Sequence, residues 1–407
     1  MGREEKRVGL ITAPGYPKEL GEALVNELPD LLRYYVEDNY NWKVEYTVDA
    51  LTGVTEKSED VLEATLDRSE KEKWDFGICL TDLPLFKGKF PIVAEACEEG
   101  RVALISLPGL GSTPMIKRVR ESILQLVNEI YYGSSDKERE QAEERIQSKD
   151  NDQHEELRNK SSTRLIGKRG FEWLSPIQRE TPREGETNID VRFTVKSRIS
   201  GALRLLTGMV RANRPWAMFP AFMKVIVFAF TTGAYALVFP TLWNLSNNYG
   251  IWRMFMLSIV SIVAMVGWII LAHRLWEKPN DERASYLRKL YNAATVLTLF
   301  VSVSLYYLLL FFIFSLAVLA IIPMGMLKSQ LTGDVGFINY FYIAWTATSV
   351  STIIGALGSA LEKEEVVLSS TYGYRQRQRY EQIKKTEEEE QEDGEGVENT
   401  QELKRVK

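Results

Sequence analysis

The sequence predicts two folds in one chain: an N-terminal three-layer α/β sandwich with a parallel sheet, and an all-α domain of four transmembrane helices. Short apolar runs alternate with helical patterns at the start of the 407 residues, and long apolar runs gather after residue 216. An almost wholly polar segment separates the two. The predicted divisions are a cytoplasmic α/β domain at 1–133, a charged linker at 134–195, a candidate interfacial helix at 196–215, four transmembrane helices within 216–361, and an acidic cytoplasmic tail at 362–407.

The α/β domain alternates strand-like with helix-like segments. Residues 7–12 (RVGLIT) and 74–80 (WDFGICL) are short apolar runs, typical of buried strands, whereas 42–48 (WKVEYTV) alternates apolar with polar residues. Strands and helices in turn favour a parallel sheet covered on both faces. In chain order we expect strands at 7–12, 42–48, 74–80, 91–96 (an edge strand) and 101–107, and helices at 18–36, 58–72 and 114–131.

The charged segments outside the two domains are expected to be solvated. Residues 134–160 are typical of a solvated helix or a disordered spacer, and the glutamate-rich tail is expected to be disordered, with a basic partner as the alternative. Residues 195–210 place Ile199 and Leu203 at helical spacing among arginines. This segment either lies on the membrane surface or continues the linker as a plain helix.

Four apolar stretches meet the requirement of roughly 20 residues for a hydrocarbon core of about 30 Å. Tryptophans stand at their ends, where an amphipathic ring prefers the membrane interface: Trp216, Trp243, Trp252 and Trp276. We therefore expect a multi-pass protein of the cell membrane, with the lipid bilayer as a partner. The predicted spans are about 217–242, 254–273, 296–322 and 337–361.

Basic residues predict the orientation of these spans. Lysines and arginines cluster before the first span and between the second and third, whereas the connections at 243–253 and 326–337 each carry one basic residue. Because Lys and Arg accumulate on the cytoplasmic side of a membrane, both termini are predicted to be cytoplasmic.

The interiors of the spans are nearly free of charge. Lys224 lies near the cytoplasmic end of the first span and can extend to the surface, so a proton-coupled transporter is disfavoured. The fourth span has a small residue at every fourth position. Such a stripe either packs against another helix, within the bundle or in a homo-oligomer, or lines a polar pore. Its members are Ala347, Ser351, Gly355 and Ser359.

Composition excludes several functions. The net charge of −5 argues against nucleic-acid binding. Both histidines lie outside the α/β domain, which excludes a Ser-His-Asp arrangement there, and Cys79 and Cys97 lack the spacing of metal ligands. No Gly-rich dinucleotide motif or P-loop occurs. We therefore expect no metal or cofactor, and an enzyme is the weaker hypothesis.

Candidate binding residues lie in the loops after the predicted strands, where ligands bind in parallel α/β sheets. In the last of these loops, glycines and hydroxyls precede a helix whose free N–H groups and Lys117 suit a phosphate or carboxylate. The alternative is turn chemistry, with Ser112 or Thr113 as an ordinary N-cap and Asp82 accepting from backbone N–H groups. The candidate ligand-binding residues are Thr12, Gly15, Thr81, Asp82, Gly109, Gly111, Ser112, Thr113 and Lys117.

Three segments resemble a known family. TDLPLF (81–86), ISLPGLGSTPMIKRVR (105–120) and GALGSALEKEEVVLSSTYGYRQRQR (355–379) are similar to a family of uncharacterised bacterial multi-pass membrane proteins with an N-terminal cytoplasmic α/β domain. The resemblance covers most of the chain and implies a bacterial cell membrane but no activity. PGLGSTPM is also similar to the PGGVGPMT loop of methylenetetrahydrofolate dehydrogenase/cyclohydrolase, whose Tyr-x-x-x-Lys pair is missing from the α/β domain.

These features favour a membrane-anchored sensor or interaction protein, whose cytoplasmic α/β domain binds a small anionic ligand or a protein partner. The alternative is a small channel or transporter gated by that domain, suggested by the hydroxyl-rich fourth span. A membrane-bound hydrolase or transferase using Asp82 is weaker, because the sequence offers neither a partner base nor a metal cluster.

Overall fold

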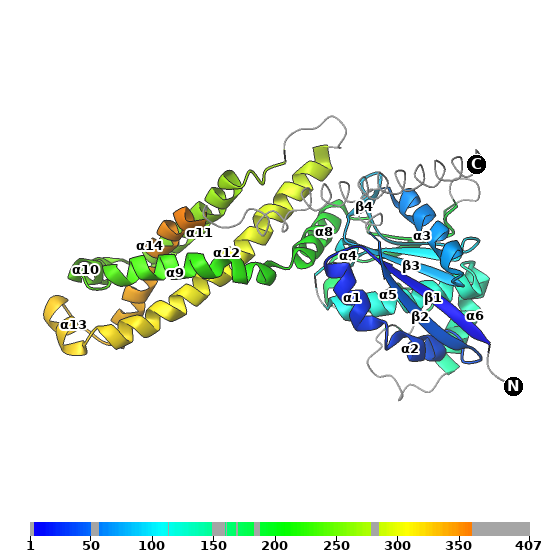
Figure 1. The fold of residues 1–407 in the computed structure, drawn as a ribbon, viewed down its shortest axis with the longest axis horizontal. Helices are drawn as coiled ribbons and strands as arrows, with labels where there is room; N and C mark the ends of the chain where they lie inside the picture. Colours follow the sequence, from blue (N-terminus) through cyan, green and yellow to red (C-terminus); the bar gives the residue numbers. More distant parts are fainter. Residues whose placement is uncertain are drawn as a thin grey trace, which may run out of the picture. The chain divides into compact units, whose positions relative to one another are not determined.

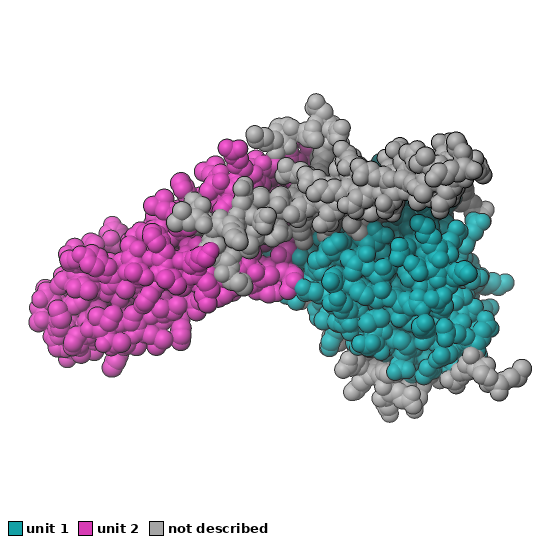
Figure 2. Space-filling view, in the orientation of Figure 1, with its two compact units in different colours: residues 1–212, 376–407 teal, residues 213–375 magenta. Residues whose placement is uncertain are grey.

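The computed structural model divides the chain into two compact units, the first ending at Ala212 and the second beginning at Asn213 (Figure 2). The structure describes residues 4–49, 57–112, 114–148, 159, 161–167, 170–182, 188–277 and 285–359.

The first unit is built on one mixed sheet (Figure 1). The strand order is β2-β1-β3-β6-β5-β8-β7, with β4 paired to β5. The pairs among β2, β1, β3 and β6 are parallel, and all others are antiparallel. The strands are β1 (Glu5–Thr12), β2 (Asn41–Val48), β3 (Phe76–Thr81), β4 (Leu85–Lys87), β5 (Phe90–Cys97), β6 (Val102–Ser106), β7 (Gln178–Glu180) and β8 (Val191–Thr194).

The expectation of a parallel sheet is therefore correct for one half and wrong for the other. Only residues 98–101 join β5 to β6, and such a short connection allows an antiparallel pair but not a parallel crossover. The predicted edge strand at 91–96 is internal, because β8 pairs with the other side of β5. In the middle of the sheet, every residue of β3 and β6 is buried.

Helices cover both faces of the sheet and give three layers. On one face α3 (Ser58–Glu72) packs against β3 and β6, and on the other α1 (Tyr16–Leu24), α2 (Leu28–Tyr35) and α5 (Met115–Tyr132) pack together (Figure 1). The single helix expected at 18–36 is broken into α1 and α2, because Pro29 suits the first turn of a helix and not its interior.

The first unit continues well past residue 133. Besides β7 and β8, the chain forms α6 (Asp136–Ser148), α7 (Gly170–Leu174) and α8 (Arg198–Asn213), and the short α4 (Leu107–Leu110) precedes α5. Leu165 and Ile166 are buried in the same core as the sheet. The segment expected to be a charged linker at 134–195 thus supplies two strands and core residues, and α8 occupies most of the candidate interfacial helix at 196–215.

The second unit is a helical bundle. Three of its described helices are long and apolar enough to cross a membrane: Ile251–Ala272, Ser285–Ile321 and Phe337–Gly358. A fourth span is reached only if Arg198–Met218 and Phe222–Ala236, which meet at 59°, count as one. The number of candidate spans is therefore three to four, where four were expected. The elements of the second unit are η2 (Pro215–Met218), α9 (Phe219–Ala236), α10 (Pro240–Asn248), α11 (Ile251–Ala272), α12 (Ser285–Ile321), α13 (Met324–Gln330) and α14 (Phe337–Ser359).

Two bounds in the second unit differ from the expected spans. The span expected at 217–242 stops at Ala236, and Pro240 begins the separate helix α10. The helix expected at 296–322 begins earlier, at Ser285. α14 packs against α9, α11 and α12 and is the most buried of the candidate spans. These helices are compatible with a multi-pass membrane protein.

Candidate functional site

The structure brings the carboxyl ends of the parallel strands together. Thr12 ends β1, Thr81 ends β3 and Ser106 ends β6, and the register places Thr12 beside Leu80 and Thr81 beside Ser106. All three hydroxyl residues are completely buried. The convergence expected from a parallel sheet is therefore present at this end of β1, β3 and β6.

The loop after β3 is held by these hydroxyls. The Leu83 N–H donates to Thr81 Oγ1 at 3.2 Å, and Ser106 Oγ donates to the Leu83 carbonyl oxygen at 2.7 Å. The predicted ligand residue Asp82 lies inside this turn and is 1 % exposed. In this structure Thr81 therefore stabilises the loop itself, as in the turn-chemistry interpretation.

The loop after β6 is packed through its glycines. A Cβ atom on Gly109 would lie 2.8 Å from the Ile92 carbonyl oxygen and 2.8 Å from Val93 Cα, so β5 leaves no room for a side chain. Gly111 ends α4 with a φ of +82°, which favours glycine. Gly109 thus serves close packing between α4 and the sheet.

The remaining candidate residues are more accessible. Gly15 is exposed with a φ of +97° at the start of α1, Ser112 is half-buried, and Lys117 is exposed in the first turn of α5. Pro114 occupies the N-cap of α5 and its side chain makes no capping hydrogen bond. Thr113 lies outside the described residues. Among the described candidates near α5, Lys117 is exposed and Ser112 is partly accessible.

α8 covers this end of the sheet. A Cβ atom on Gly208 would collide with the Pro108 carbonyl oxygen and lie 2.7 Å from Pro108 Cα, so α8 and α4 touch through their backbones (Figure 1). The guanidinium of Arg211 lies 5.9 Å from the centre of the Tyr16 ring. One helix therefore lies against the start of α1, which follows β1, and against α4, which follows β6.

A buried ionic cluster fixes α8 in place. Arg204 Nη1 donates to the Leu110 carbonyl oxygen at 3.2 Å, and Arg118 Nη1 donates to the same oxygen at 2.5 Å. Glu172 of α7 lies between the two guanidinium groups, 2.7 Å from Arg118 Nη2 and 3.5 Å from Arg204 Nη2. Burial lowers the pKa of Arg204 to about 10, so its charge persists at neutral pH.

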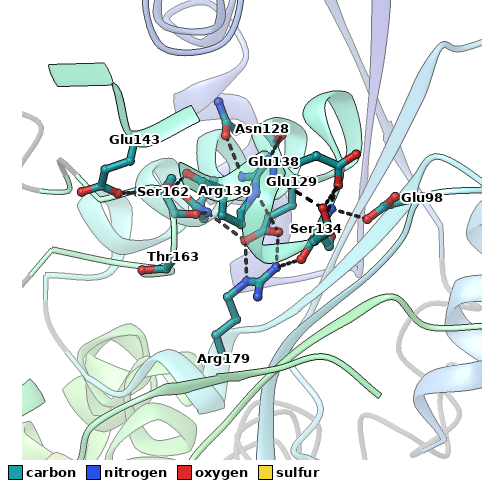
Figure 3. Close-up of polar contacts among 12 residues, drawn as sticks. Glu98, Asn128, Glu129, Ser134, Glu138, Arg139, Glu143, Ser162, Thr163 and Arg179 are labelled. Atoms are coloured by element: carbon teal, nitrogen blue, oxygen red, sulfur yellow. Dashed lines mark hydrogen bonds and ion pairs between the residues drawn. The ribbon is translucent and has the colours of Figure 1, made fainter. Parts of the chain in front are cut away.

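A second ionic cluster holds the chain after residue 133 against α5 (Figure 3). Glu129 is completely buried and accepts two hydrogen bonds of 2.9 Å from Arg179. Arg139 lies 3.6 Å from the same carboxylate and donates to Asn128 at 2.9 Å. Arg179 also donates to the Ser134 carbonyl oxygen at 2.5 Å. α6 and β7 are therefore fastened to α5 through one carboxylate.

Sequence reasoning missed these clusters. Arg118, next to the predicted ligand residue Lys117, bonds to the Leu110 carbonyl oxygen and to Glu172. A signal was present in α5, where apolar residues extend around more of the helix than the single apolar face of a surface helix: Ile123, Leu124, Leu126, Val127 and Ile130. Apolar residues around most of a helix indicate that other parts of the chain cover it.

The small residues of α14 lie inside the bundle. Ala347, Ser351 and Gly355 are buried. A Cβ atom on Gly233 of α9 would collide with Ser351 Oγ, and one on Gly355 would lie 2.6 Å from the Tyr306 hydroxyl. The side chain of Ser359 lies outside the described residues. The stripe thus lets α9 and α12 approach α14 closely.

An open cleft of about 1040 Å³ lies at the opposite end of the sheet, between α3 and the start of β6. Its lining includes Glu63, Glu70, Asp75, Lys73 and Arg101, and none of the predicted ligand residues. In the described part of the chain, no group of three His, Cys, Asp or Glu side chains could hold a metal ion. Comparison with protein-family models, curated proteins and solved structures finds no match to this chain.

Proposed function

We propose that the protein is a membrane-anchored, non-enzymatic sensor or interaction protein, with its α/β unit and both termini in the cytoplasm. The unit binds a small anionic ligand or a protein partner at the loops that follow β1, β3 and β6. The uneven distribution of Lys and Arg around the apolar helices supports the orientation. The resemblance to bacterial membrane proteins supports a location in the cell membrane.

One observation carries this proposal: α8 lies against the segments that follow β1 and β6 and leads directly into the helical bundle. Gly208 meets Pro108, and Arg204 bonds to Leu110, so a ligand that moves the loop after β6 also moves α8. Only η2 separates the end of α8 from α9 in the chain. A ligand bound at the loops therefore acts on a helix that the chain joins directly to the apolar helices.

The test uses the full chain in lipid nanodiscs and a panel of phosphorylated and carboxylated metabolites. A binding metabolite should raise the melting temperature, and Lys117→Ala and Ser112→Ala should each reduce that rise. Lys71→Ala on α3 is the matched control, since Lys71 is an exposed lysine away from these loops. If no metabolite in the panel shifts the melting temperature, the small ligand is ruled out and only a protein partner remains.

The relay is tested separately by hydrogen exchange. Ligand binding should slow or accelerate exchange in peptides covering 198–213, and Gly208→Ala should alter that response because its methyl group strains the contact with Pro108. Gly170→Ala is the control, because nothing lies within 4 Å of its Cβ position. An unchanged α8 in the bound protein would contradict the relay.

The alternative of a gated channel or transporter has less support from the bundle. Thr348 Oγ1 donates to the Ala344 carbonyl oxygen at 2.7 Å and Thr352 Oγ1 to the Thr348 carbonyl oxygen at 2.8 Å, so hydroxyls of α14 bond along their own helix. Solute flux through reconstituted protein, changed by Ser351→Leu, would favour the channel over the sensor.

A further inference from the structure

We infer that one face of the first unit lies against an anionic lipid surface. This face, called the α7/α8 face, consists of Trp173 and Leu174 on α7, Ile199 and Leu203 on α8, and Phe90 at the start of β5. Trp173 is 85 % exposed, Leu174 72 % and Ile199 86 %, and large apolar side chains with this exposure mark an interaction surface.

The elements that carry these side chains, α7, α8 and β5, are held together within the first unit. Ser175, directly after α7, donates to the Ser200 carbonyl oxygen at 3.2 Å and accepts from Arg204 Nε at 3.2 Å. On the buried side of α8, opposite Ile199 and Leu203, a Cβ atom on Gly201 would lie 3.1 Å from Pro91 Cγ, so α8 also packs on the start of β5. The apolar residues therefore sit on elements that hold fixed positions within the unit.

The charges around the α7/α8 face are positive. Lys87 and Lys89 flank the turn before Phe90, and Lys196 and Arg198 stand at the start of α8; all four are exposed. No Asp or Glu occurs between Asp190 and Glu277. Among the described acidic residues, Glu180 lies 3.4 Å from Lys196, and Glu172 is paired with Arg118 and Arg204. Apolar side chains ringed by cations suit the headgroup region of an anionic bilayer.

The course of the chain favours lipid over a soluble partner as the occupant. α8 ends at Asn213, the exposed Trp216 follows, and the apolar helix α9 begins at Phe219. A face on the helix that immediately precedes a membrane-entering segment is held near the headgroups by its own chain, and tryptophan prefers that zone. The inference rests on membrane insertion of the second unit and not on ligand binding by the loops.

The test measures how close α8 lies to lipid in the full chain. A fluorophore is attached at Ser197→Cys in a Cys97→Ser background, since Ser197 is exposed and Cys79 is buried. The protein is placed in nanodiscs of zwitterionic lipid, with or without anionic lipid, that carry a headgroup-level quencher. We expect quenching about twofold stronger in the anionic discs, as apolar and electrostatic contributions add.

Two sets of variants distinguish lipid contact by the α7/α8 face from mere closeness of the first unit to the bilayer. Ile199→Ser with Leu203→Ser, and Trp173→Ser alone, should each lower the quenching without lowering the melting temperature, because these side chains are exposed. Val48→Ser should leave it unchanged, since Val48 is an exposed apolar residue of β2 outside this face. Equal quenching in both lipids, or in all variants, would overturn the inference. If the fluorophore is shielded only after a soluble protein is added, the occupant of the α7/α8 face is that protein and not lipid.

Discussion

Arg204 of α8 donates a hydrogen bond of 3.2 Å to the carbonyl oxygen of Leu110, the last residue of α4. Both residues are completely buried, and the bond joins the helix before the bundle to the loop after β6. An arginine side chain that bonds to a backbone carbonyl, a serine and a carboxylate can hold a helix in one position. The attachment of α8 is therefore open to test by single substitutions.

Arg204→Met should destabilise the first unit by about 3 kcal/mol, because it removes one partner of a buried ionic cluster. Glu172 would keep its ion pair with Arg118, while the Leu110 carbonyl oxygen would lose one of its two hydrogen-bond donors. Urea unfolding of the detergent-solubilised chain measures the loss. Arg198→Met is the control on the same helix, because Arg198 is exposed. Equal losses in the two variants would show that the cluster adds no stability.

Glu129→Gln should loosen the chain that covers α5. The amide cannot balance Arg139 and Arg179, and breaking such a buried pair costs about 3–5 kcal/mol. Amide exchange in peptides covering 134–148 and 178–180 should become faster. Glu140→Gln, at an exposed position of α6, should leave exchange as in the unchanged protein. If both variants exchange alike, the ionic cluster does not hold this segment.

Two adjacent tyrosines of α12 should respond differently to loss of their hydroxyls. Tyr307 shares hydrogen bonds of 2.9 Å with Ser258 and 2.7 Å with Ser349, so Tyr307→Phe should cost about 0.5–1.5 kcal/mol. The Tyr306 hydroxyl is buried and has no hydrogen-bond partner among the described residues, so Tyr306→Phe should be neutral or stabilising. Thermal unfolding in one detergent compares the two, and a reversed order would contradict the bonding pattern.

Acid should weaken the first unit through Glu45. Hydrogen bonds from Arg7 and then Trp74 lower the pKa of Glu45 to about 2, from an ordinary value of 4.5. Because the folded-state pKa is the lower one, this stabilisation is complete above pH 4.5 and is lost as the pH falls towards 2. Glu45→Gln should lower the melting temperature at neutral pH. The melting temperature of this variant should also decrease less than that of the unchanged protein when the pH is lowered from 4.5 to about 2. Glu63→Gln, at an exposed site on α3, should leave this decrease unchanged.

Much of the central sheet could be predicted from the sequence. Continuous apolar runs predicted β3 and β6, and the alternation of strands with helices predicted the parallel half, in which the loops after β1, β3 and β6 meet at one end of the sheet. β8 was missed because VRFT is short and carries Arg192, whose charge is neutralised by an ion pair with Glu95 of β5. An ion pair between strands that are far apart in the sequence leaves no local pattern.

The coverage of the candidate site could not be predicted for a similar reason. Periodicity identified a helix with Ile199 and Leu203 on one face, but periodicity does not say which partner that helix meets. Arg204, one of the arginines of this helix, is completely buried and bonds to the carbonyl oxygens of Leu110 and Ser175. The packing of α8 depends on contacts with residues far away in the sequence, such as Pro108.

The position of β5 between β6 and β8 has a consequence for how the protein is made. Until the ribosome has added β8, the edge of β5 that later pairs with β8 presents free backbone N–H and C=O groups, which are a template for aggregation. β8 is completed shortly before the apolar segment that starts at Phe219 leaves the ribosome. The nascent chain must therefore close its sheet and expose its first long apolar helix at nearly the same time, so a delay in one step leaves an unpaired strand or an apolar helix exposed during the other.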